Sequence, residues 1–469
     1  FKVIHVIETE ERKMVKKAKN KSIILSIILI SYFVIVLDIS VVITALPKIQ
    51  ESLHLSQSNL TWVQNTYTLI FGGLLLLGGR AGDIFGRRKM FILGLIIFGL
   101  GSLLVGTALN AVWLVIARAL QGVGAALLAP STLALLMDNF EEGEERTKAV
   151  SYYGAVAGIG ASAGLVLGGI FASWLSWRYA FFINVPISIV MYILTKKHIK
   201  ESATIAGKFD ISGTATSLLG IVGLVYGIVT LEEQLMIALI SIAVGGILLI
   251  TFVYTQKRAD QPIMPLRLFK SGERNGAYLA RMLFLGAMMA FWFFITQFLQ
   301  SIYGFSPLQA GIGFFPMTVA NFISAMLVPR FTRSFNNGRV LLCGLIITTI
   351  GMFWLSFVSG NSSYIASVAL PMIFIGFGQG LSLSPLTAAG IAHTEASDAG
   401  AASGVVNVAH QVGGSLGLAL LVAISSLAAS SGLVTQVNVA LKGGSVMLVF
   451  AIILVVALIL PVMKKEIKN

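Results

Sequence analysis

Long apolar runs separated by short polar stretches occupy most of the 469-residue chain. A run of roughly 20 apolar residues can cross the hydrocarbon core of a bilayer as a single helix. Fourteen runs have about this length and predict membrane-spanning helices; they cover 22–46, 61–79, 90–109, 113–137, 147–172, 180–195, 211–231, 235–256, 277–299, 307–329, 339–358, 364–389, 400–429 and 444–463. The pattern predicts an all-α integral membrane protein.

The composition of the chain supports this class. Only 11% of the residues are charged and 56% are apolar, whereas a soluble globular protein carries about 25% charged residues. So few charges cannot cover soluble domains, which excludes an ordinary cytosolic enzyme, a secreted disulfide scaffold and a disordered chain. The single cysteine, Cys343, permits neither an internal disulfide nor a cysteine-based metal cluster. Because no soluble domain interrupts the runs, we expect the function to reside between helices.

The net charge of +13 comes from basic residues that gather on one side of the predicted membrane. If the N-terminus is cytoplasmic, 27 of the 33 Lys and Arg residues fall in cytoplasmic segments, and the outer segments carry 3, namely Lys48, Arg178 and Lys442. This asymmetry predicts that both termini are cytoplasmic. Topology and attraction to anionic lipid headgroups then explain the basic charge, so nucleic-acid binding is not required.

The loop after the second run combines acidic, basic and glycine residues at a defined spacing: Gly79, Asp83, Gly86, Arg87 and Arg88. A basic turn that follows the positive-inside rule would explain the arginines, but not Asp83 or the glycines. An acid four residues before a basic pair can cap a helix end and pair with a neighbouring helix. We therefore predict a conformational gate, a latch that breaks and re-forms as two helical bundles rock.

Two ionisable residues lie deep within predicted spans, where charges are costly. Asp38 lies about 12 Å from the outer end of 22–46, and Arg118 lies about 9 Å inside 113–137, at the helical rise per residue. Asp38 could be a purely structural hydrogen-bonding group, and Arg118 could extend toward the outer surface. Because each needs a partner in a low dielectric, we predict instead that they form a contact that alternates during function.

Glycines in the fifth run predict a tightly packed helix. Gly160, Gly164, Gly168 and Gly169 follow one another at spacings that place small residues on one face. Such a face lets two membrane helices approach closely.

These stretches resemble motifs of the major facilitator superfamily. The loop at 79–89 is similar to its G-x-x-x-D-x-x-G-R-R/K signature, and 118–126 is similar to its R-x-x-Q-G-x-G-A-A motif, which is associated with proton relay. The first run resembles the L-D-x-T-V-V-N-V-A-L-P motif of drug:proton antiporters, with Ser40 and Ile43 replacing the threonine and the asparagine. The fifth run resembles their G-x-x-x-G-P-x-x-G-G motif, with Leu165 at the proline position.

Further stretches extend the resemblance into both halves of the chain. The residues at 177–186, 300–316 and 404–414 resemble motifs of fourteen-span members. The basic stretch at 330–339 resembles a divergent repeat of the loop at 79–89. Two parallel structural halves would produce such a repeat. The chain is identified as a member of the fourteen-span drug:proton antiporter family of this superfamily.

The resemblance implies the major facilitator fold, with fourteen transmembrane helices arranged as six, two and six. The N-terminal bundle would be 22–200, the extra pair of helices 201–260 and the C-terminal bundle 261–463, with cytoplasmic segments at 1–21 and 464–469. The extra pair carries no deep charge, so we expect it at the lipid-facing periphery. The protein would be a multi-pass monomer of the bacterial cytoplasmic membrane.

The resemblance also implies a function, the proton-coupled export of lipophilic, monocationic or zwitterionic drugs by alternating access, and hence antibiotic resistance. Asp38 and Arg118 would couple protons, and the proton gradient would supply energy without a cofactor or metal. The predicted cavity residues are Tyr67, Gln121, Trp292, Phe294, Gln297, Phe298, Asn321, Asn407 and Gln411. As a set, aromatic and amide side chains suit flat, lipophilic, cationic molecules.

Alternatives stay open from the sequence. Any single aromatic or amide residue could instead face lipid or join helices. An exporter of the same fold could carry a physiological cargo such as a lipid, an amino acid or a siderophore. A membrane enzyme or channel would need a metal cluster, a nucleophile set or a continuous polar pore, and the five scattered histidines supply none of these.

Overall fold

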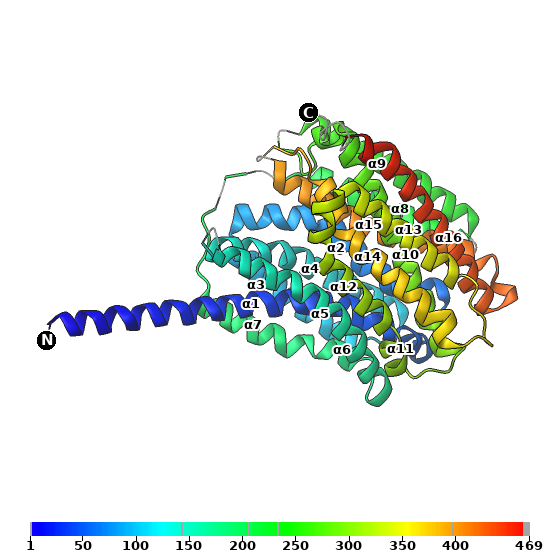
Figure 1. Cartoon of the computed structure of the whole chain (residues 1–469), viewed down its shortest axis with the longest axis horizontal. Coiled ribbons are helices and arrows are strands. Elements are labelled where there is room, and N and C mark those ends of the chain that lie inside the picture. The colour runs from blue at the N-terminus through cyan, green and yellow to red at the C-terminus, as the bar shows by residue number, and fades with distance from the viewer. Residues whose placement is uncertain are drawn as a thin grey trace.

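The computed structural model describes the backbone of residues 2–141, 144–204, 206–207, 209–231, 234–259, 261–395 and 398–462, with most side chains from residue 20 onward. The regular elements of these residues are helices, which run side by side (Figure 1). The N-terminal half contains α1 (Lys2–Leu53), α2 (Gln57–Phe85), α3 (Arg87–Gly106), α4 (Ala111–Asn139), α5 (Glu144–Trp174), α6 (Tyr179–Phe182) and α7 (Asn184–His198).

Two further helices, α8 (Ile211–Val229) and α9 (Leu235–Arg258), lie between the halves in sequence. The C-terminal half contains η1 (Leu266–Lys270), α10 (Gly272–Ser301), α11 (Pro307–Gly313), α12 (Phe315–Phe335), α13 (Asn337–Leu355), η2 (Ile365–Ala369), α14 (Leu370–Gly390), α15 (Ala399–Ser426), η4 (Ala429–Ser431), α16 (Leu433–Leu454) and η5 (Val455–Ile459).

Most of the predicted spans have a counterpart in the structure. Among the described residues, thirteen helical segments are long and apolar enough to cross a membrane. The predicted span 147–172 falls on α5, in which the described apolar stretch is the shorter Ile159–Trp174. The structure therefore confirms an all-helical architecture made of membrane-length segments.

Several helices extend beyond the predicted spans, and the first and last show this most clearly. The first span was expected to end at 46, but α1 continues through Pro47 to Leu53. The last was expected to begin at 444, but α16 begins at Leu433, so Lys442 lies inside a helix rather than in an outer loop. The apolar residues Val437, Ala440 and Leu441 are buried at helical spacing, and their packing continues the helix through a stretch that also carries Gln436, Asn438 and Lys442.

The two halves repeat the same helix pairings. In the N-terminal half, α1 packs on α5, α2 and α3 both pack on α4, and α3 packs on α7. In the C-terminal half, α10 packs on α15, α12 and α13 both pack on α14, and α13 packs on α16. This correspondence is the arrangement that two parallel structural repeats produce.

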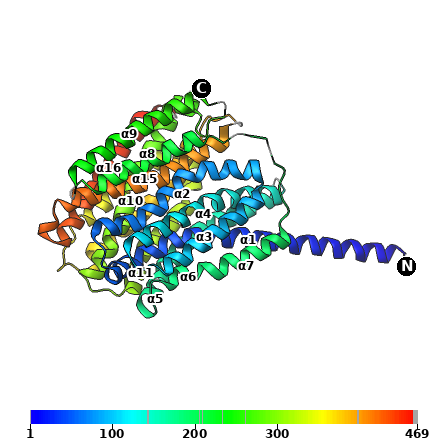
Figure 2. The same cartoon turned by 180° about the vertical axis from the view of Figure 1, so that it is seen from behind.

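The extra pair packs against the outside of this repeat. Helices α8 and α9 pack on each other, and α8 also contacts α2 and α15 (Figure 2). Only 17% of the most apolar window of α9 is buried, so most of that helix presents apolar side chains outward. Burial of Leu69, Val225 and Ala419 in one cluster joins α8 to both halves.

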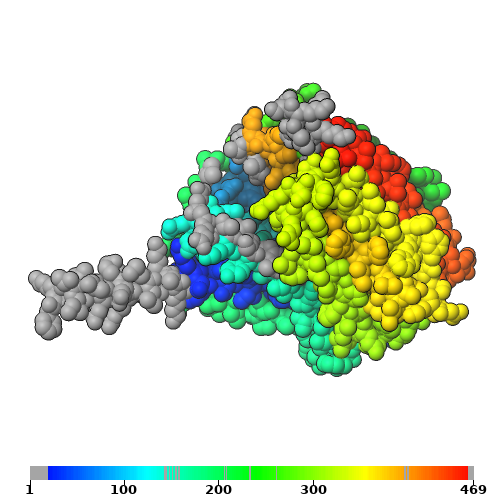
Figure 3. Space-filling view, in the orientation of Figure 1, coloured from blue at the N-terminus to red at the C-terminus, as the bar shows by residue number. Residues whose placement is uncertain are grey.

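The bundle has two chemically distinct ends. We call the end that carries Arg87, Lys196, Arg258, Arg274 and Arg333 the basic end, and the other end the opposite end. The N-terminal and C-terminal halves lie next to each other between these ends, as the blue-to-cyan and yellow regions of Figure 3 show. Helix pairs α2–α15 and α5–α11 join the two halves.

Candidate transport site

Asp38 and Arg118 meet in the core of the N-terminal half. The Nη1 of Arg118 donates to Oδ2 of Asp38 at 2.5 Å, and both side chains have no exposed surface. The Nε of Arg118 donates to the carbonyl of Val63 at 3.1 Å, which ties the pair to α2. The structure therefore brings together the two deep charges that the sequence analysis singled out, while their part in proton coupling stays a prediction.

Three more polar side chains complete the surroundings of Asp38. Its Oδ1 accepts from Nε2 of Gln121 at 3.0 Å and from Nδ2 of Asn184 at 3.1 Å. The hydroxyl of Ser102 accepts from the same two amides, at 2.7 and 3.3 Å. The carboxylate thus has partners from α4 and α7, and these partners are held in turn from α3. Gln121, predicted to line the cavity, belongs to this enclosed network.

An aromatic ring covers the arginine of the pair. The guanidinium of Arg118 lies 4.4 Å from the ring centroid of Tyr67, a distance at which a cation is attracted to the π face. Tyr67 is fully buried, and its hydroxyl has no hydrogen-bond partner among the described residues. Tyr67 therefore covers one face of the Arg118 guanidinium. Asp38 is fully buried as well and has no direct access to solvent in this conformation.

The predicted glycine face of α5 packs directly on α1. A Cβ at Gly164 would lie 2.6 Å from Ser40 Cβ, and one at Gly168 would lie 2.5 Å from the carbonyl of Val41. Gly160 lies against Val36 in the same way, with a Cβ distance of 3.2 Å. Since real Cβ atoms essentially never approach within 3.0 Å, a larger side chain at Gly164 or Gly168 would force α5 away from α1.

Gly169 instead packs on the other half, where its Cβ would lie 2.6 Å from the Cα of Leu308 in α11. Leu165, at the position of the family proline, contributes its carbonyl oxygen to the same region. That oxygen accepts from the Thr44 hydroxyl at 3.2 Å and lies against Gly311 of α11. One carbonyl of α5 therefore contacts α1 on one side and the C-terminal half on the other.

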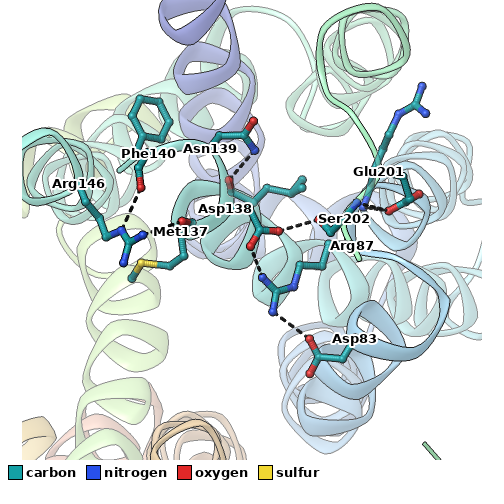
Figure 4. A network of polar contacts seen from close by, with 11 residues as sticks. Asp83, Arg87, Met137, Asp138, Asn139, Phe140, Arg146, Glu201 and Ser202 are labelled. Carbon is teal, nitrogen blue, oxygen red and sulfur yellow. Dashed lines mark hydrogen bonds and ion pairs between the residues drawn. The ribbon is translucent and has the colours of Figure 1, made fainter. Parts of the chain in front are cut away.

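The predicted latch lies at the basic end (Figure 4). Arg87 donates to Asp83 at 3.1 Å and to Asp138, at the end of α4, at 2.5 Å. Asp138 also accepts from the Ser202 hydroxyl at 2.6 Å. The Cβ of Pro130 in α4 lies 3.7 Å from the Cβ position of Gly79. These contacts join α2, α3, α4 and the segment after α7. The three helices belong to the N-terminal half and the segment follows directly from it, so the latch belongs to that half.

The turn between α2 and α3 depends on Gly86, whose φ is 107°. Residues with a Cβ atom avoid this conformation, whereas glycine adopts it readily. The carboxylate of Glu201 lies against this glycine and accepts from the backbone N–H groups of Arg88 and Lys89 at 3.0 and 3.1 Å. Arg88 also donates from Nη2 to the carbonyl of Lys196 at 2.9 Å. The acid therefore satisfies free N–H groups at the start of α3, where a negative charge is stabilising.

Sequence reasoning missed several of these groups. Ser102, Asn184, Asp138, Glu201 and Ser202 were given no role. Asn184 lies in the stretch 177–186, which resembles a family motif. That resemblance was the available signal that Asn184 could have a function. Glu201 lies in an inner connection, where no periodic pattern predicts which helix end its carboxylate will reach.

Most of the predicted cavity residues of α10 are enclosed. Phe294 and Phe298 are at most 1% exposed, and Gln297 accepts from Nε2 of Gln57 at 3.2 Å. Trp292 is partly exposed and lies 4.6 Å from Phe314, centroid to centroid. Trp292 also lines a narrow crevice between α1, α2 and α10, together with Ile43, Gln64 and Met289.

The remaining predicted cavity residues lie on two other helices. Asn321 of α12 is partly buried, and its Oδ1 has no partner among the described residues. Asn407 of α15 is exposed, and Gln411, one turn further on, packs against Gly72 of α2. The structure thus does not gather the nine predicted residues into one lining in this conformation.

Several hydrogen bonds between the halves lie toward the opposite end. Besides the pair of Gln57 and Gln297, Gln300 donates to the carbonyl of Thr44 at 3.0 Å, and the N–H of Leu308 donates to the Ser173 hydroxyl at 3.0 Å. Nearer the middle, the hydroxyls of Thr68 and Ser415 are hydrogen-bonded at 2.6 Å. The halves are therefore joined by hydrogen bonds from α1, α2 and α5 to α10, α11 and α15.

Comparison with known proteins identifies the family. The profile of the Major Facilitator Superfamily matches residues 28–418 and, in a second alignment, residues 278–468. The chain belongs to the major facilitator superfamily. It is therefore a multi-pass transporter of the cell membrane and not an enzyme.

Relatives of this superfamily member include antibiotic resistance and export proteins. It is 37% identical to the puromycin resistance protein of Streptomyces alboniger, over 86% of this chain and 81% of that protein. It is 35% identical to the cephamycin export protein of Amycolatopsis lactamdurans, over 84% and 83% of the two chains. It is 30% identical to the lincomycin resistance protein of Streptomyces lincolnensis, over 94% and 92%.

Solved structures share the fold of this superfamily member. The nucleoside transporter NupG has a TM-score of 0.68 at 11% identity, over 93% of this chain and 100% of that one. A bacterial homologue of the human lysosomal transporter Spinster, in an inward-facing and unoccupied conformation, has a TM-score of 0.65 at 14% identity, over 93% and 95% of the chains. At these identities the similarity concerns the fold alone.

Proposed function

We propose that the protein is a drug exporter driven by the proton gradient, which exchanges protons for lipophilic cationic or zwitterionic molecules by alternating access. The observation that carries this proposal is the fully buried pair of Asp38 and Arg118 in the core of the N-terminal half. The resistance and export functions of the relatives support the choice of cargo class. In keeping with this role, we propose fourteen spans and place both termini, and hence the basic end, in the cytoplasm.

Asp38 is suited to carry the proton because it is the carboxylate that the described spans hold far from a helix end. Protonation would neutralise it and leave the guanidinium of Arg118 buried without a counter-charge. An uncompensated charge in a low dielectric is strongly unfavourable, so the conformation with Asp38 protonated would favour a rearrangement of Arg118. Proton binding and helix packing would then be linked in one equilibrium.

A path of direct contacts leads from this carboxylate to the other half. Helix α1, which carries Asp38, is held on α5 through Gly164 and Gly168. On the same helix, Thr44 donates to the Leu165 carbonyl, which lies against Gly311 of α11. A shift of α1 would therefore act on a contact between the halves, which is the kind of two-state element that coupling requires.

The cargo would enter between the halves. The partly exposed Trp292, which packs on Phe314, offers apolar and π surface there, and Asn321 and Asn407 offer amide groups. Flat cations suit such surroundings through cation–π and apolar contacts. With the basic end in the cytoplasm, the hydrogen bonds of Gln57, Thr44 and Ser173 would close the outer side of this space.

A single coupled carboxylate implies one proton per cycle. Export of a monovalent cation against one proton moves no net charge, so only the pH gradient would drive it, at about 1.4 kcal/mol per pH unit. A zwitterion exchanged for one proton would move one charge and gain about 2.3 kcal/mol more per 100 mV. Divalent cations should be poor substrates, because one proton cannot balance their charge.

Reconstitution in lipid vesicles tests the proposal. Ethidium, a flat monocation, should accumulate in vesicles when a pH gradient is imposed, and the proton ionophore nigericin with potassium should abolish this accumulation. A potassium diffusion potential set with valinomycin should leave the ethidium rate unchanged. Accumulation that persists without a pH gradient would overturn proton coupling, and a clear dependence on potential would overturn the exchange of one proton for one cation.

A further inference from the structure

Arg281 of α10 is a buried cation for which the structure shows no counter-ion. Three arginines are buried among the described residues: Arg118, Arg274 and Arg281. Arg118 pairs with Asp38, and Arg274 donates to backbone carbonyls that include those of Ala392 and His393, at 3.0 and 2.9 Å. Arg281 is 7% exposed, and no ion pair joins it to a carboxylate of the described residues.

The partners of Arg281 are both formally neutral. Its Nη1 donates to the Thr387 hydroxyl of α14 at 2.8 Å, and its Nη2 lies 3.2 Å from Nδ1 of His410 in α15. Its Nε is buried and has no partner among the described residues. A buried arginine that lacks both a carboxylate and a full set of acceptors is costly, and an incoming anion would relieve that cost.

The imidazole of His410 extends the donor set of Arg281. A guanidinium has only N–H donors and cannot accept a hydrogen bond. Nδ1 of His410 must therefore be the acceptor in this contact, which leaves the proton of the neutral ring on Nε2. His410 is only partly buried, and no hydrogen bond to Nε2 is found in the described part of the chain. The histidine thus offers a second N–H next to the cation.

His410 belongs to a polar stripe of α15, and Arg281 lies beside this stripe. Ser403, Asn407, His410 and Gln411 recur at helical spacing and are exposed or partly exposed. The neighbouring faces of α15 are occupied, because Gly404 packs on Leu76 of α2 and Gly413 and Gly417 pack on α10. Leu416 and Ala419 face α8 on the side away from the stripe. The stripe therefore lies between α2 of one half and α10 of the other.

We infer that Arg281 and His410 form a binding site for the carboxylate of a zwitterionic cargo that enters between the halves. This inference rests on the proposed export function and narrows its substrate class. Arginine and histidine N–H groups form short, charge-assisted hydrogen bonds with carboxylates. A cargo carboxylate would compensate the charge that the protein itself leaves unpaired, while the cationic or aromatic part of the cargo lies against the aromatic rings.

A matched pair of dyes tests this assignment on the full-length protein. Tetramethylrhodamine has a free carboxylate, and its methyl ester has the same aromatic body without that negative charge. Binding of each dye to the purified protein in phosphatidylcholine nanodiscs is measured by fluorescence polarisation, without a proton gradient. Failure of proton coupling therefore cannot be mistaken for failure of this site.

Arg281→Gln should weaken binding of the carboxylate dye about tenfold or more, as expected for loss of a charge-assisted hydrogen bond. Binding of the methyl ester should change much less, and Arg281→Lys should retain part of the preference for the carboxylate dye. Arg333→Gln removes an exposed charge at the end of α12 and is the control for net charge; it should leave both affinities unchanged.

Equal weakening of both dyes by Arg281→Gln would show that Arg281 only ties α10 to α14 and α15, and would overturn the inference. So would equal affinity of the native protein for the two dyes. If phosphatidylglycerol in the nanodiscs abolished the dependence on Arg281, the anion would be a lipid headgroup and the assignment to cargo would be wrong. Thermal melting of each variant verifies that it is folded.

Discussion

The two halves of the transporter share one scaffold but differ in how they compensate buried charge. In the N-terminal half, α1 and α5 approach closely at Gly164 and Gly168; in the C-terminal half, α10 and α15 do so at Gly286, Gly413 and Gly417. Repeated helix pairings thus use small residues at the same kind of contact. The scaffold therefore needs close helix approach in both halves.

The charged residues do not follow this repeat. The first helix of the N-terminal half carries Asp38, which pairs with Arg118 of α4. The corresponding helix of the C-terminal half, α10, carries Arg281, which meets only Thr387 and His410. Under the two proposals above, the N-terminal half would hold a complete ion pair for the proton, and the C-terminal half would keep an unpaired cation for the cargo.

The two corresponding turns at the basic end, after α2 and after α12, also differ in their charged residues. After α2, Gly86 has a positive φ, and Asp83, Arg87 and Asp138 form a charged network. After α12, Asn336 has a φ of 62° and caps α13 by accepting from the N–H of Arg339 at 3.0 Å. Both turns reverse the chain, but only the first carries acids that can form a latch.

The largest effect is expected from Asp38→Asn. An amide cannot exchange the proton, so coupled export of ethidium should fall to background. Breaking a buried ion pair costs about 3–5 kcal/mol, so the melting temperature should also fall. Transport and thermal melting of the purified variant measure the two effects.

The double variant Asp38→Asn with Arg118→Gln is the control for Asp38→Asn, because it removes the uncompensated guanidinium as well. It should recover much of the lost stability without recovering export. Coupled export by the single variant at a normal rate would contradict the assignment of the proton to the N-terminal half.

Glycine substitutions test whether the two halves share their packing. Gly168→Val in α5 and Gly417→Val in α15 both place atoms closer than 3.0 Å to a neighbouring helix backbone. Each should lower stability by about 1–3 kcal/mol, as overpacking does, or prevent folding. Denaturation monitored by thermal melting compares them.

Gly246→Ala is the matched control for these glycine variants, because a Cβ at Gly246 meets nothing within 4 Å. It should leave the melting temperature unchanged. If Gly417→Val were tolerated and Gly168→Val were not, the view that the halves use equivalent packing would be wrong.

A smaller effect is expected at the latch. Asp83→Asn or Arg87→Ala should lower the maximal transport rate roughly two- to fivefold, since partly exposed ion pairs contribute about 0.2–1 kcal/mol. The concentration of ethidium for half-maximal rate should stay unchanged, because the latch lies at the basic end. Arg339→Gln, in the loop that lacks acids, should change neither value. A weaker apparent affinity at an unchanged maximal rate would reverse the interpretation of the network as a gate.

The smallest effect concerns the connection before α15. Arg267 donates two hydrogen bonds to Asp398, one of them at 2.6 Å, and this contact lowers the pKa of the Asp398 carboxyl below its ordinary value of 3.8. A carboxyl with a lowered pKa stabilises the fold above its unfolded pKa, and this stabilisation disappears as the pH falls through the lowered value.

The small difference in melting temperature between the native protein and Asp398→Asn should therefore be constant near neutral pH and should begin to shrink below about pH 4, as the pH approaches the lowered pKa. Thermal melting between pH 7 and pH 3 measures this difference. A difference that does not shrink at all between pH 5 and pH 3 would show that Asp398 acts through packing rather than charge.

Much of the fold could be predicted from local patterns. Apolar runs of membrane length are a property of consecutive residues, so thirteen described segments matched predicted spans. The close packing of Gly160, Gly164 and Gly168 on α1 agrees with their spacing, because helical periodicity places them on one face. Boundaries at Leu53 and Leu433 could not be predicted from hydropathy alone, because tertiary packing continues those helices.

The partners of the buried groups were less predictable. The contact of Asp38 with Arg118 was expected from depth and unmet charge. Its contacts with Gln121 and Asn184 were not, because the rotation of each helix about its axis is set by packing. Glu201 was missed for a related reason, since its carboxylate reaches the start of α3 from a connection without a periodic pattern.

The sequence by itself determined the membrane class, the basic end, the close-packed glycine face and the presence of buried charges, because each depends on residues near one another in the chain. Only the tertiary structure decided which charges are compensated. Asp38 and Arg118 are 80 residues apart and meet, while Arg281 meets a hydroxyl 106 residues away and an imidazole 129 residues away. The cost of a buried charge depends on the atoms that surround it in space, and helix packing alone places those atoms.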